Sequence, residues 1–185
     1  EKLFSERMCR HFTEDFGLET RIVRYHNVYG PVGTYDGGRE KAPAALCRKV
    51  INAKINNSKS IDVWGDGKQT RSFMYIDDCL DGTEKVFNSD KRDVYNVGSS
   101  EQVSINQMID MIEDIAEIKL ERNYQLDKPK GVRGRSSDNS YITKKIGWKS
   151  EHSLKQGLTK TYNWIEQQIN SGSNIDKFCR GSIEE

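Results

Sequence analysis

Apolar residues near the start of the chain recur at helical spacing and then form a continuous run. An apolar residue stands at every fourth position of the first stretch: Phe4, Met8, Phe12 and Phe16. This spacing predicts a helix with one apolar face over residues 1–16. Gly17 is a natural end for it, because glycine adopts the left-handed backbone of a helix C-cap. The run TRIVRY at 20–25 then predicts a short strand.

The next part of the chain alternates between helical patterns and strand patterns. The expected elements, in order, are a helix over 44–55, strands over 61–64 and 70–76, and a helix over 77–87. Pro43 would lie in the first turn of the first helix, where proline is tolerated. The two strands flank the tight turn Gly65-Asp66-Gly67, so we expect them to pair around it. Asp77 is expected to cap the helix that follows.

The last part of the chain contains the clearest helix signals. The expected elements, in order, are a strand over 94–97, a helix over 104–115, a strand over 122–126, and helices over 139–146 and 154–169. Ser104 and Gln107 form a capping box for the first of these helices, and Ser153 is expected to cap the last. Residues 128–138 read as a loop rich in glycine and basic residues. The tail after Ser171 is polar, and we expect it to be mobile.

Composition and charge exclude several classes of protein. The chain has 185 residues, of which 35% are hydrophobic and 31% charged, which suits a globular protein with a modest core. Lysine and arginine (29) nearly balance aspartate and glutamate (28), so nothing indicates a polyanion binder. No apolar run approaches the roughly 20 residues of a membrane helix, and we expect no signal peptide. The 4 cysteines are scattered, which argues against a structural zinc site and favours free thiols in a reducing, cytoplasmic compartment over disulfides.

The order of the elements predicts a mixed α/β fold, but no strand is followed by G-x-G-x-x-G. A nucleotide-cofactor fold would need that element upstream of Glu1. The chain starts at Glu1 rather than at Met, and it starts inside a helical pattern. We therefore expect it to be a fragment of a longer protein.

Three separated segments hold polar residues of the kind that bind a phosphorylated ligand. They contribute Asn27 just past a strand end, then Gln69, Thr70 and Arg71 after the Gly-Asp-Gly turn, and then Arg133 and Arg135. Ligands of α/β folds gather at strand ends. Arginine forks make paired, charge-assisted bonds to phosphate oxygens. A diphosphate site and a set of separate surface ion pairs both fit these residues.

Three longer motifs stand in order along the chain: RYHNVYGP at 24–31, WGDGKQTRSFMYIDD at 64–78 and GVRGRSSD at 131–138. Together they resemble the carboxyl-terminal half of an extended short-chain dehydrogenase/reductase of the NAD-dependent epimerase/dehydratase family, and the resemblance runs from Glu1 to about residue 170. It implies that residues 1–30 are the last helix and strand of a Rossmann domain. Residues 31–170 would be mainly a smaller mixed α/β substrate-binding domain, with some segments returning to the Rossmann domain, and 171–185 a polar tail. It also implies a homodimer.

Several residues match the ligand contacts of this family. Lys2 resembles the lysine of a Y-x-x-x-K pair, which holds the nicotinamide ribose of NAD and lowers the pKa of a tyrosine that would lie upstream of Glu1. Asn27 is similar to the asparagine that binds the sugar nucleotide. The resemblance implies that a substrate-contacting triplet is formed by Glu40, Lys41 and Ala42. It implies further nucleotide and diphosphate contacts for Lys49, Gln69, Thr70, Arg71 and Arg135. A partner acid/base cysteine would lie upstream, since none of the cysteines here fits that role.

The stretch GGREKAPAA at 37–45 most resembles those members of the family that invert a hexose at C3 and C5. This resemblance implies GDP-mannose or a related nucleotide sugar as substrate and GDP-L-galactose as product. Hydride transfer from C4 of the hexose to NAD would acidify the protons on C3 and C5, and Lys41 matches a group that moves one of them. A carboxylate beside Lys41 would favour its charged form. We therefore expect Glu40 and Lys41 to face different partners.

Other interpretations stay open at this point. Another extended reductase, such as a UDP-sugar 4-epimerase or a sugar-nucleotide dehydratase, would need neither Lys41 nor its loop. A non-catalytic sugar-nucleotide-binding subunit would keep the binding residues without the chemistry, and the segment 26–44 also fits an ordinary surface loop. Structural roles are expected for the remaining polar and aromatic candidates: hydrogen bonding for His26, surface positions for His11 and His152, helix capping for Asp77 and Asp78, and core or edge-of-core packing for Trp64, Trp148 and Trp164.

Overall fold

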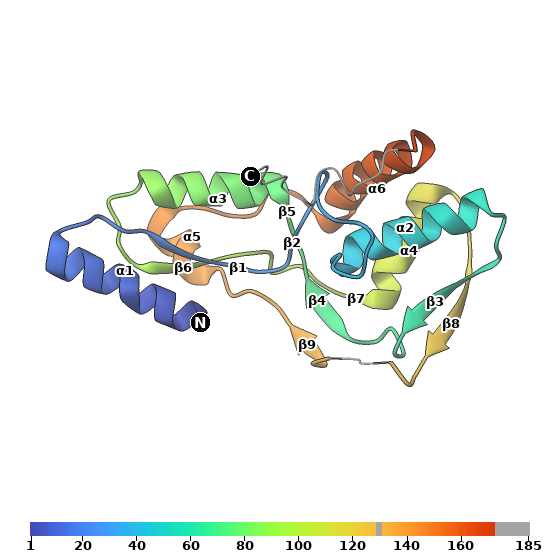
Figure 1. The fold of residues 1–185 in the computed structure, drawn as a ribbon, viewed down its shortest axis with the longest axis horizontal. Helices are drawn as coiled ribbons and strands as arrows, with labels where there is room; N and C mark the ends of the chain where they lie inside the picture. The colour runs from blue at the N-terminus through green and yellow to red at the C-terminus, as the bar shows by residue number, and fades with distance from the viewer. Residues whose placement is uncertain (129–130, 173–185) are drawn as a thin grey trace, which may run out of the picture.

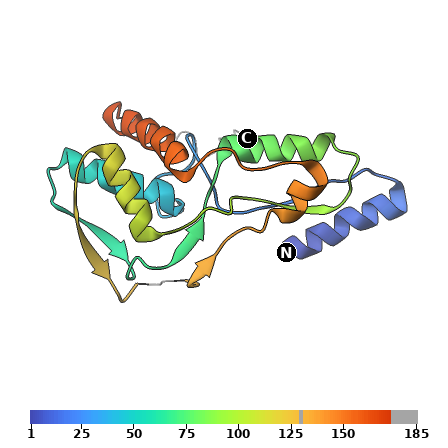
Figure 2. The ribbon, with the colours of Figure 1, turned by 180° about the vertical axis from the view of Figure 1, so that it is seen from behind.

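The computed structural model describes residues 1–128 and 131–172. In this part of the chain two hydrophobic cores lie side by side along the long axis of the molecule (Figure 1). Helix α1 (Lys2–Phe16) lies at one end, and strands β3 (Ser60–Trp64) and β8 (Glu121–Gln125) lie at the other. Figure 2 shows the same order from behind. The predicted tail lies, from residue 173 on, outside the described residues.

The first core lies beside a two-stranded parallel sheet. The sheet consists of β1 (Ile22–Tyr25) and β6 (Val94–Val97), and the helices at this core are α3 (Ile76–Asn88) and α5 (Ser140–Ile146). Its buried side chains include Met74, Val86, Tyr95, Val97, Ile142 and Trp148. Because parallel strands direct their carboxyl ends to one edge, the chain leaves β1 and β6 at neighbouring points. The His26 amide donates to the Val97 carbonyl there (3.1 Å).

The second core lies among three helices and the inner face of a second parallel pair. Helices α2 (Ala42–Ile55), α4 (Ile105–Ala116) and α6 (Leu154–Asn170) pack against one another, and β3 pairs with β8 beside them. The fully buried side chains include Cys47, Val50, Met108, Ile109, Ile112, Leu158 and Ile165. The apolar stripe predicted for the last helix therefore packs α6 against this core.

Short strands lie between the two cores (Figure 1). Strand β2 (Val28–Tyr29) pairs in parallel with β5 (Met74–Tyr75). Strand β4 (Thr70–Ser72) lies between β7 (Gln102–Ser104), which is antiparallel to it, and β9 (Gly134–Arg135), which is parallel. The strand β9 interrupts the segment 128–138 that was expected to be a loop throughout.

Most helix ends follow the local rules seen in the sequence. Gly17 and Gly147 end α1 and α5 in the left-handed conformation, with φ of 67° and 77°. The capping box predicted at Ser104 is confirmed, and Ser153 forms a second one at the start of α6. Helix α2 begins two residues earlier than predicted, and Pro43 lies in its first turn.

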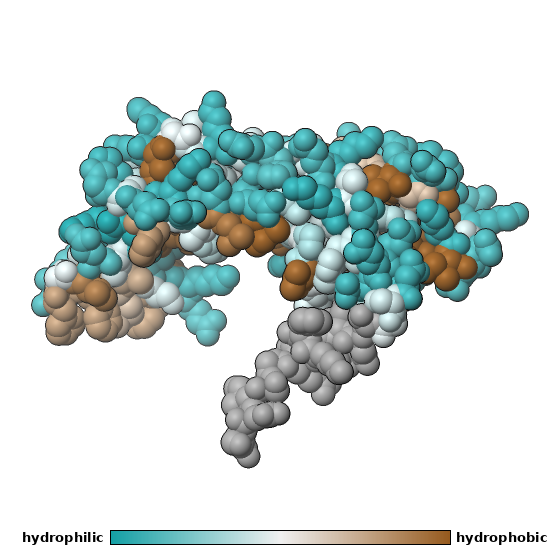
Figure 3. Space-filling view, turned by 90° about the horizontal axis from the view of Figure 1, so that it is seen from above, coloured by the Kyte–Doolittle hydropathy of each residue, from teal (hydrophilic) through white to brown (hydrophobic). Residues whose placement is uncertain are grey.

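Helix α1 has an apolar face that is largely exposed. The exposed fractions are 66% for Phe4, 44% for Phe12 and 75% for Phe16. Figure 3 shows apolar side chains gathered at this end of the molecule. The face predicted from the four-residue spacing is present, but the described residues of this chain do not bury it.

The predicted pairing of strands around Gly65-Asp66-Gly67 is wrong. β3 pairs with β8, whereas β4 pairs with β7 and β9. The turn bonds to the start of α4 instead: the amides of Ile105 and Asn106 donate to the carbonyls of Gln69 (3.2 Å) and Gly67 (3.0 Å). The first amides of a helix need acceptors from outside the helix. The carbonyls of Gly67 and Gln69 supply these acceptors, so the turn contacts α4 and does not close a hairpin between β3 and β4.

The expected capping of α3 by its two acidic residues is also wrong. The N-cap of α3 is Tyr75, with no side-chain cap. Asp78, which is 4% exposed, accepts hydrogen bonds from the amides of Glu151 (3.2 Å) and His152 (3.2 Å), and its carboxylate lies 2.9 Å from the His152 ring. His152 is therefore half-buried rather than a surface residue. A buried carboxylate needs several donors, and the segment before α6 provides them.

The three tryptophans have different environments. Trp148 is fully buried in the first core, and Trp164 packs at the edge of the second against Tyr35, with ring centroids 5.6 Å apart. Trp64 is 57% exposed, so the expectation of a core role is wrong for it. It lies on the outer face of β3, because side chains alternate along a strand and Val63 points inward.

Gly157 of α6 provides a test of the second core. A Cβ there would lie 2.2 Å from the Tyr29 hydroxyl, which donates to the Leu154 carbonyl at 3.1 Å. Glycine to alanine within a helix otherwise gains about 1 kcal/mol. We expect overpacking to outweigh this gain, so that Gly157→Ala lowers the free energy of unfolding in urea by about 2 kcal/mol. The exposed Asn163→Ala on the same helix should change it by less than about 0.5 kcal/mol. A Gly157→Ala protein as stable as the parent would contradict this packing.

Candidate functional site

Asn27 lies at the carboxyl end of β1 in an unusual backbone conformation, with φ of 47°. Its carbonyl accepts from the Met74 amide (3.1 Å), and its side-chain Nδ2 donates to the Ser72 carbonyl (3.0 Å). Asparagine tolerates left-handed backbone better than most residues because its short side chain bonds locally. Asn27 therefore ties the end of β1 to the junction of β4 and β5.

The predicted arginines lie next to each other on paired strands. Arg71 of β4 stands opposite Arg135 of β9, and Thr70 stands opposite Gly134. The structure thus brings together two of the three polar segments found in the sequence. Residues directly opposite in a sheet lie on one face, and like charges there repel. An anion between the two guanidinium groups would relieve that repulsion.

His26 lies close to the same arginines. Its Nδ1 is 3.3 Å from the Ser72 hydroxyl, and its Nε2 is buried with no hydrogen-bond partner among the described residues. Burial lowers the pKa of His26 below its ordinary value, and the positive charges of Arg135 and Arg71 lower it further. The lowered pKa favours neutral His26, so the positive charge at this end of the site comes from the two arginines.

The residues that precede α2 form what we call the glycine loop, residues 35–41. Gly37 and Gly38 have φ of 88° and 82°, which favours glycine strongly. At the end of the loop the Glu40 carboxylate turns inward and pairs with Arg48 (3.0 Å). Lys41 is the N-cap residue of α2 and is exposed. Glu40 therefore pairs with Arg48 and not with Lys41, and the partner that Lys41 faces stays a prediction.

A cavity of about 440 Å³ lies between the glycine loop, α2 and β3. Its lining includes four of the predicted residues, which are Glu40, Ala42, Lys49 and Gln69. Lys49 donates to the Asp62 carbonyl (2.7 Å), and burial lowers its pKa. Gln69 Nε2 donates to the Trp64 carbonyl (3.3 Å). Glu40 Oε2 and Gln69 Oε1 are buried and have no partner among the described residues, so both are acceptors with unused hydrogen-bonding capacity on residues that line the cavity.

Two lining residues of this cavity were missed by the sequence analysis as site residues. Trp64 presents an exposed aromatic ring, and Arg48 holds Glu40. The signal for Trp64 was the alternation in β3, where Ser60 and Asp62 share its outward face. No comparable signal pointed to Arg48, because its partners come from a loop.

The predicted residues do not all meet. Lys2 lies in the first turn of α1, exposed and in the other part of the molecule (Figure 1). Lys41 does not line the cavity. Gln69, Thr70 and Arg71 are consecutive and connect the cavity to the arginine pair. The candidate site is therefore one region with two ends: the arginine pair on β4 and β9 at one end, and the cavity beside the glycine loop at the other.

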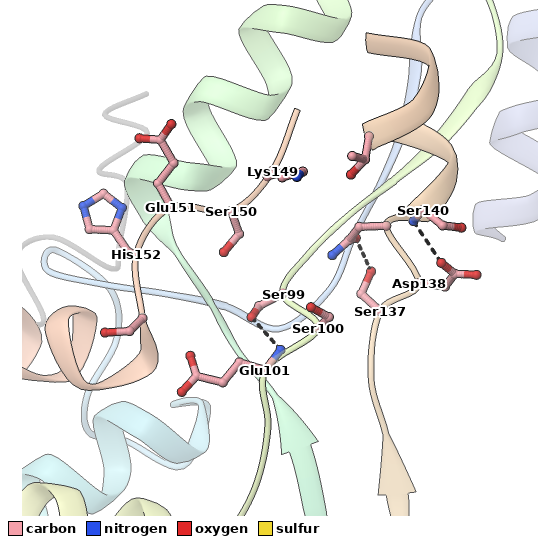
Figure 4. Close-up of a pocket in the computed structure, with 13 residues that line it drawn as sticks. Ser99, Ser100, Glu101, Ser137, Asp138, Ser140, Lys149, Ser150, Glu151 and His152 are labelled. Atoms are coloured by element: carbon pink, nitrogen blue, oxygen red, sulfur yellow. Dashed lines mark hydrogen bonds between the residues drawn. The ribbon is translucent and has the colours of Figure 1, made fainter. Parts of the chain in front are cut away.

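A larger groove, of about 640 Å³, lies elsewhere and contains none of the predicted residues. Figure 4 shows it between the segments 99–101, 137–140 and 149–153. Its serines and acids already bond locally: the Ser140 amide donates to Asp138 (2.9 Å), and the Leu154 amide donates to Glu101 (2.7 Å). Size alone therefore does not make this groove the site.

Within residues 1–128 and 131–172, no group of three or more His, Cys, Asp and Glu side chains is arranged to hold a metal ion. None of the helices in that part of the chain has the length and apolar character needed to span a membrane.

The amino-acid sequence is similar to curated sugar-nucleotide enzymes. GDP-mannose 3,5-epimerase of Arabidopsis thaliana is 49% identical over 187 residues, which cover 99% of this chain and 48% of that protein. A probable GDP-L-fucose synthase of Oryza sativa subsp. japonica is 28% identical over 91% of this chain and 51% of its own length. The chain thus spans about half the length of the curated relatives it matches.

Solved structures confirm the predicted α/β fold class. UDP-glucuronic acid 4-epimerase from Bacillus cereus, in complex with UDP-glucuronic acid and NAD, has a TM-score of 0.72 at 30% identity, over 89% of this chain and 51% of that chain. UDP-glucose 4-epimerase from Thermotoga maritima has a TM-score of 0.80 at 24% identity, over 90% of this chain and 52% of that chain, and shows the fold alone. The model of the NAD dependent epimerase/dehydratase family matches residues 1–98. With more than half of its residues matched, the chain belongs to the NAD dependent epimerase/dehydratase family.

Proposed function

We propose that this chain forms the substrate-binding part of an NAD-dependent enzyme that epimerises a nucleotide sugar, with GDP-mannose as substrate and GDP-L-galactose as product. The observation that carries the proposal is the 49% identity to a GDP-mannose 3,5-epimerase over 99% of the chain. The homodimer and the cytoplasmic location expected from the sequence stay predictions.

Among the described residues, Lys2 is the one that we assign to NAD. The part of the chain that the structure describes offers no strand followed by a glycine-rich turn and a helix, which is where a dinucleotide pyrophosphate is held. Lys2, exposed in the first turn of α1, is the residue we assign to the nicotinamide ribose. When bound, NAD supplies reversible hydride transfer at C4 of the hexose.

The two ends of the candidate site suit the two ends of a nucleotide. Arg71 and Arg135, side by side on β4 and β9, would bind the diphosphate, and Asn27 would hold the backbone beside it. The exposed Trp64 ring would stack on the base. The free acceptors Glu40 Oε2 and Gln69 Oε1 favour a base with adjacent donors, which guanine has at N1 and N2, over uracil with its single N–H.

Lys41 is the chain's candidate for proton transfer at C3 and C5. It is exposed at the start of α2, and among the described residues no ion pair engages its ammonium group. It is therefore available to a sugar bound outside the glycine loop. Moving a proton at these carbons needs a positioned side chain of this kind.

Substitution of Trp64 tests the base end of the site. Trp64→Ala should weaken GDP binding about tenfold, because stacking on one base is worth about 1–3 kcal/mol. Inorganic pyrophosphate, which has no base, should bind as before, and Trp64→Phe should retain most of the GDP affinity. Isothermal titration of both ligands checks this. An equal loss for pyrophosphate would show that Trp64 acts on folding rather than on the base.

Substitution of Lys41 tests the chemistry. In the full-length protein, which includes the NAD-binding part, Lys41→Ala should reduce deuterium uptake at C3 and C5 of GDP-mannose in D₂O by about 100-fold or more, as expected for loss of a general acid/base. Oxidation at C4, followed by the absorbance of reduced cofactor, should persist. Arg39→Ala removes a neighbouring exposed cation and should leave both steps unchanged. Full epimerisation by Lys41→Ala would rule out this role and favour a 4-epimerase or a dehydratase.

A further inference from the structure

We propose that Arg48 is a positioning residue that holds the glycine loop on both sides of Gly37-Gly38 and so fixes where Glu40 and Lys41 stand against the substrate. Its catalytic consequence rests on the proposed function. The contact with the loop is independent of that function and is tested separately.

The tip of the glycine loop has no support from packing. A Cβ at Gly37 or at Gly38 would meet no heavy atom within 4 Å. Glycine also has more backbone conformations to lose than any other residue. Without a specific interaction, the residues after these glycines would not keep one position.

Arg48 supplies that interaction from a single planar group. Its Nε donates to the Tyr35 carbonyl (2.8 Å), before the glycines, and its Nη2 donates to Glu40 Oε1 (3.0 Å), after them. The Asp36 carboxylate lies 3.5 Å from the same Nε. The Arg48 side chain is 22% exposed and that of Glu40 is 10% exposed, so water competes little for this pair. A guanidinium fork can bridge two points in fixed geometry, whereas an ammonium group cannot.

Arg48 is itself well anchored. It lies two helical turns after Lys41 on α2, and its helix neighbours Cys47 and Val50 are fully buried. Tyr35, which is 5% exposed, packs edge-on against Trp164. The start of the loop is thus held by packing and by Arg48, while Arg48 alone holds the Glu40 carboxylate among the described side chains.

Limited proteolysis tests the contact without any ligand. Trypsin cleaves after Arg39 and Lys41, which lie in the loop, and mass spectrometry identifies those cuts. We expect Arg48→Met to be cleaved there at least tenfold faster than the parent protein, and Arg48→Lys to be cleaved nearly as fast as Arg48→Met. Lys54→Met, which removes a cation and a 4.0 Å ion pair from the same helix, is the control and should be cleaved at the parent rate.

A second variant keeps the test valid if Arg48→Met does not fold. Removing Arg48 leaves the Glu40 carboxylate buried without its partner, and Glu40→Gln combined with Arg48→Met removes that charge as well. This double variant should fold and should still be cleaved rapidly in the loop. A folded Arg48→Met or double variant that is cleaved at the parent rate overturns the proposal.

Catalysis tests the consequence of the contact. In the full-length protein, Arg48→Met should lose at least tenfold in deuterium uptake at C3 and C5 while C4 oxidation persists, a division that a general loss of stability would not produce. Fast cleavage with unchanged uptake overturns the positioning role. If the full-length parent protein, with its NAD-binding part, takes up no deuterium from GDP-mannose, the proposed function fails, and proteolysis still decides the contact.

Discussion

Strand β4 is only three residues long, but its backbone pairing is what brings the candidate site together. It bonds to β7 on one side and to β9 on the other, and its last carbonyl, that of Ser72, accepts from Asn27. Strand register leaves little freedom, so Arg71 and Arg135 must lie opposite each other although they are distant in the sequence. Gln69, just before β4, reaches the cavity. Without this strand the polar segments would be separate surface features.

Charge and desolvation give the two ends of the site opposite preferences. At the β4–β9 end, two adjacent arginines favour an anion, and His26 beside them adds no charge because burial lowers its pKa. In the cavity, the buried unpartnered atoms of Glu40 and Gln69 are acceptors and favour N–H or O–H groups. A nucleoside diphosphate linked to a sugar carries both kinds of group within one molecule. The glycine loop lies beside the cavity end, where the backbone can approach a ligand closely.

Local sequence signals predicted most of the elements and the residues whose placement in the structure defines the candidate site. The helix C-caps at Gly17 and Gly147 and the capping box at Ser104 depend on a few neighbouring residues, so they could be predicted from the sequence. The hairpin around residues 65–67 was predicted wrongly, because the acceptors of that turn were taken by α4, a partner distant in sequence.

Side-chain environments showed the same division between local and distant causes. The roles of Asp78 and His152 depend on a contact between α3 and the segment before α6. Trp64 was assigned to a core by residue type, although the alternation in its own strand placed it outward. Arg48 could not be found without knowing the path of the glycine loop. Tertiary partners, rather than propensities, decided each of these positions.

A nucleotide sugar bound as we propose would contact the glycine loop, the β3–β4 turn and β9 together. Amide hydrogen exchange with and without GDP-mannose measures this directly. We predict slower exchange in residues 36–42, 64–71 and 131–135 at the same ligand concentration, with UDP-glucose producing less protection in all three. Protection of only one segment, or equal protection by both sugars, would contradict a single site that selects the guanine nucleotide.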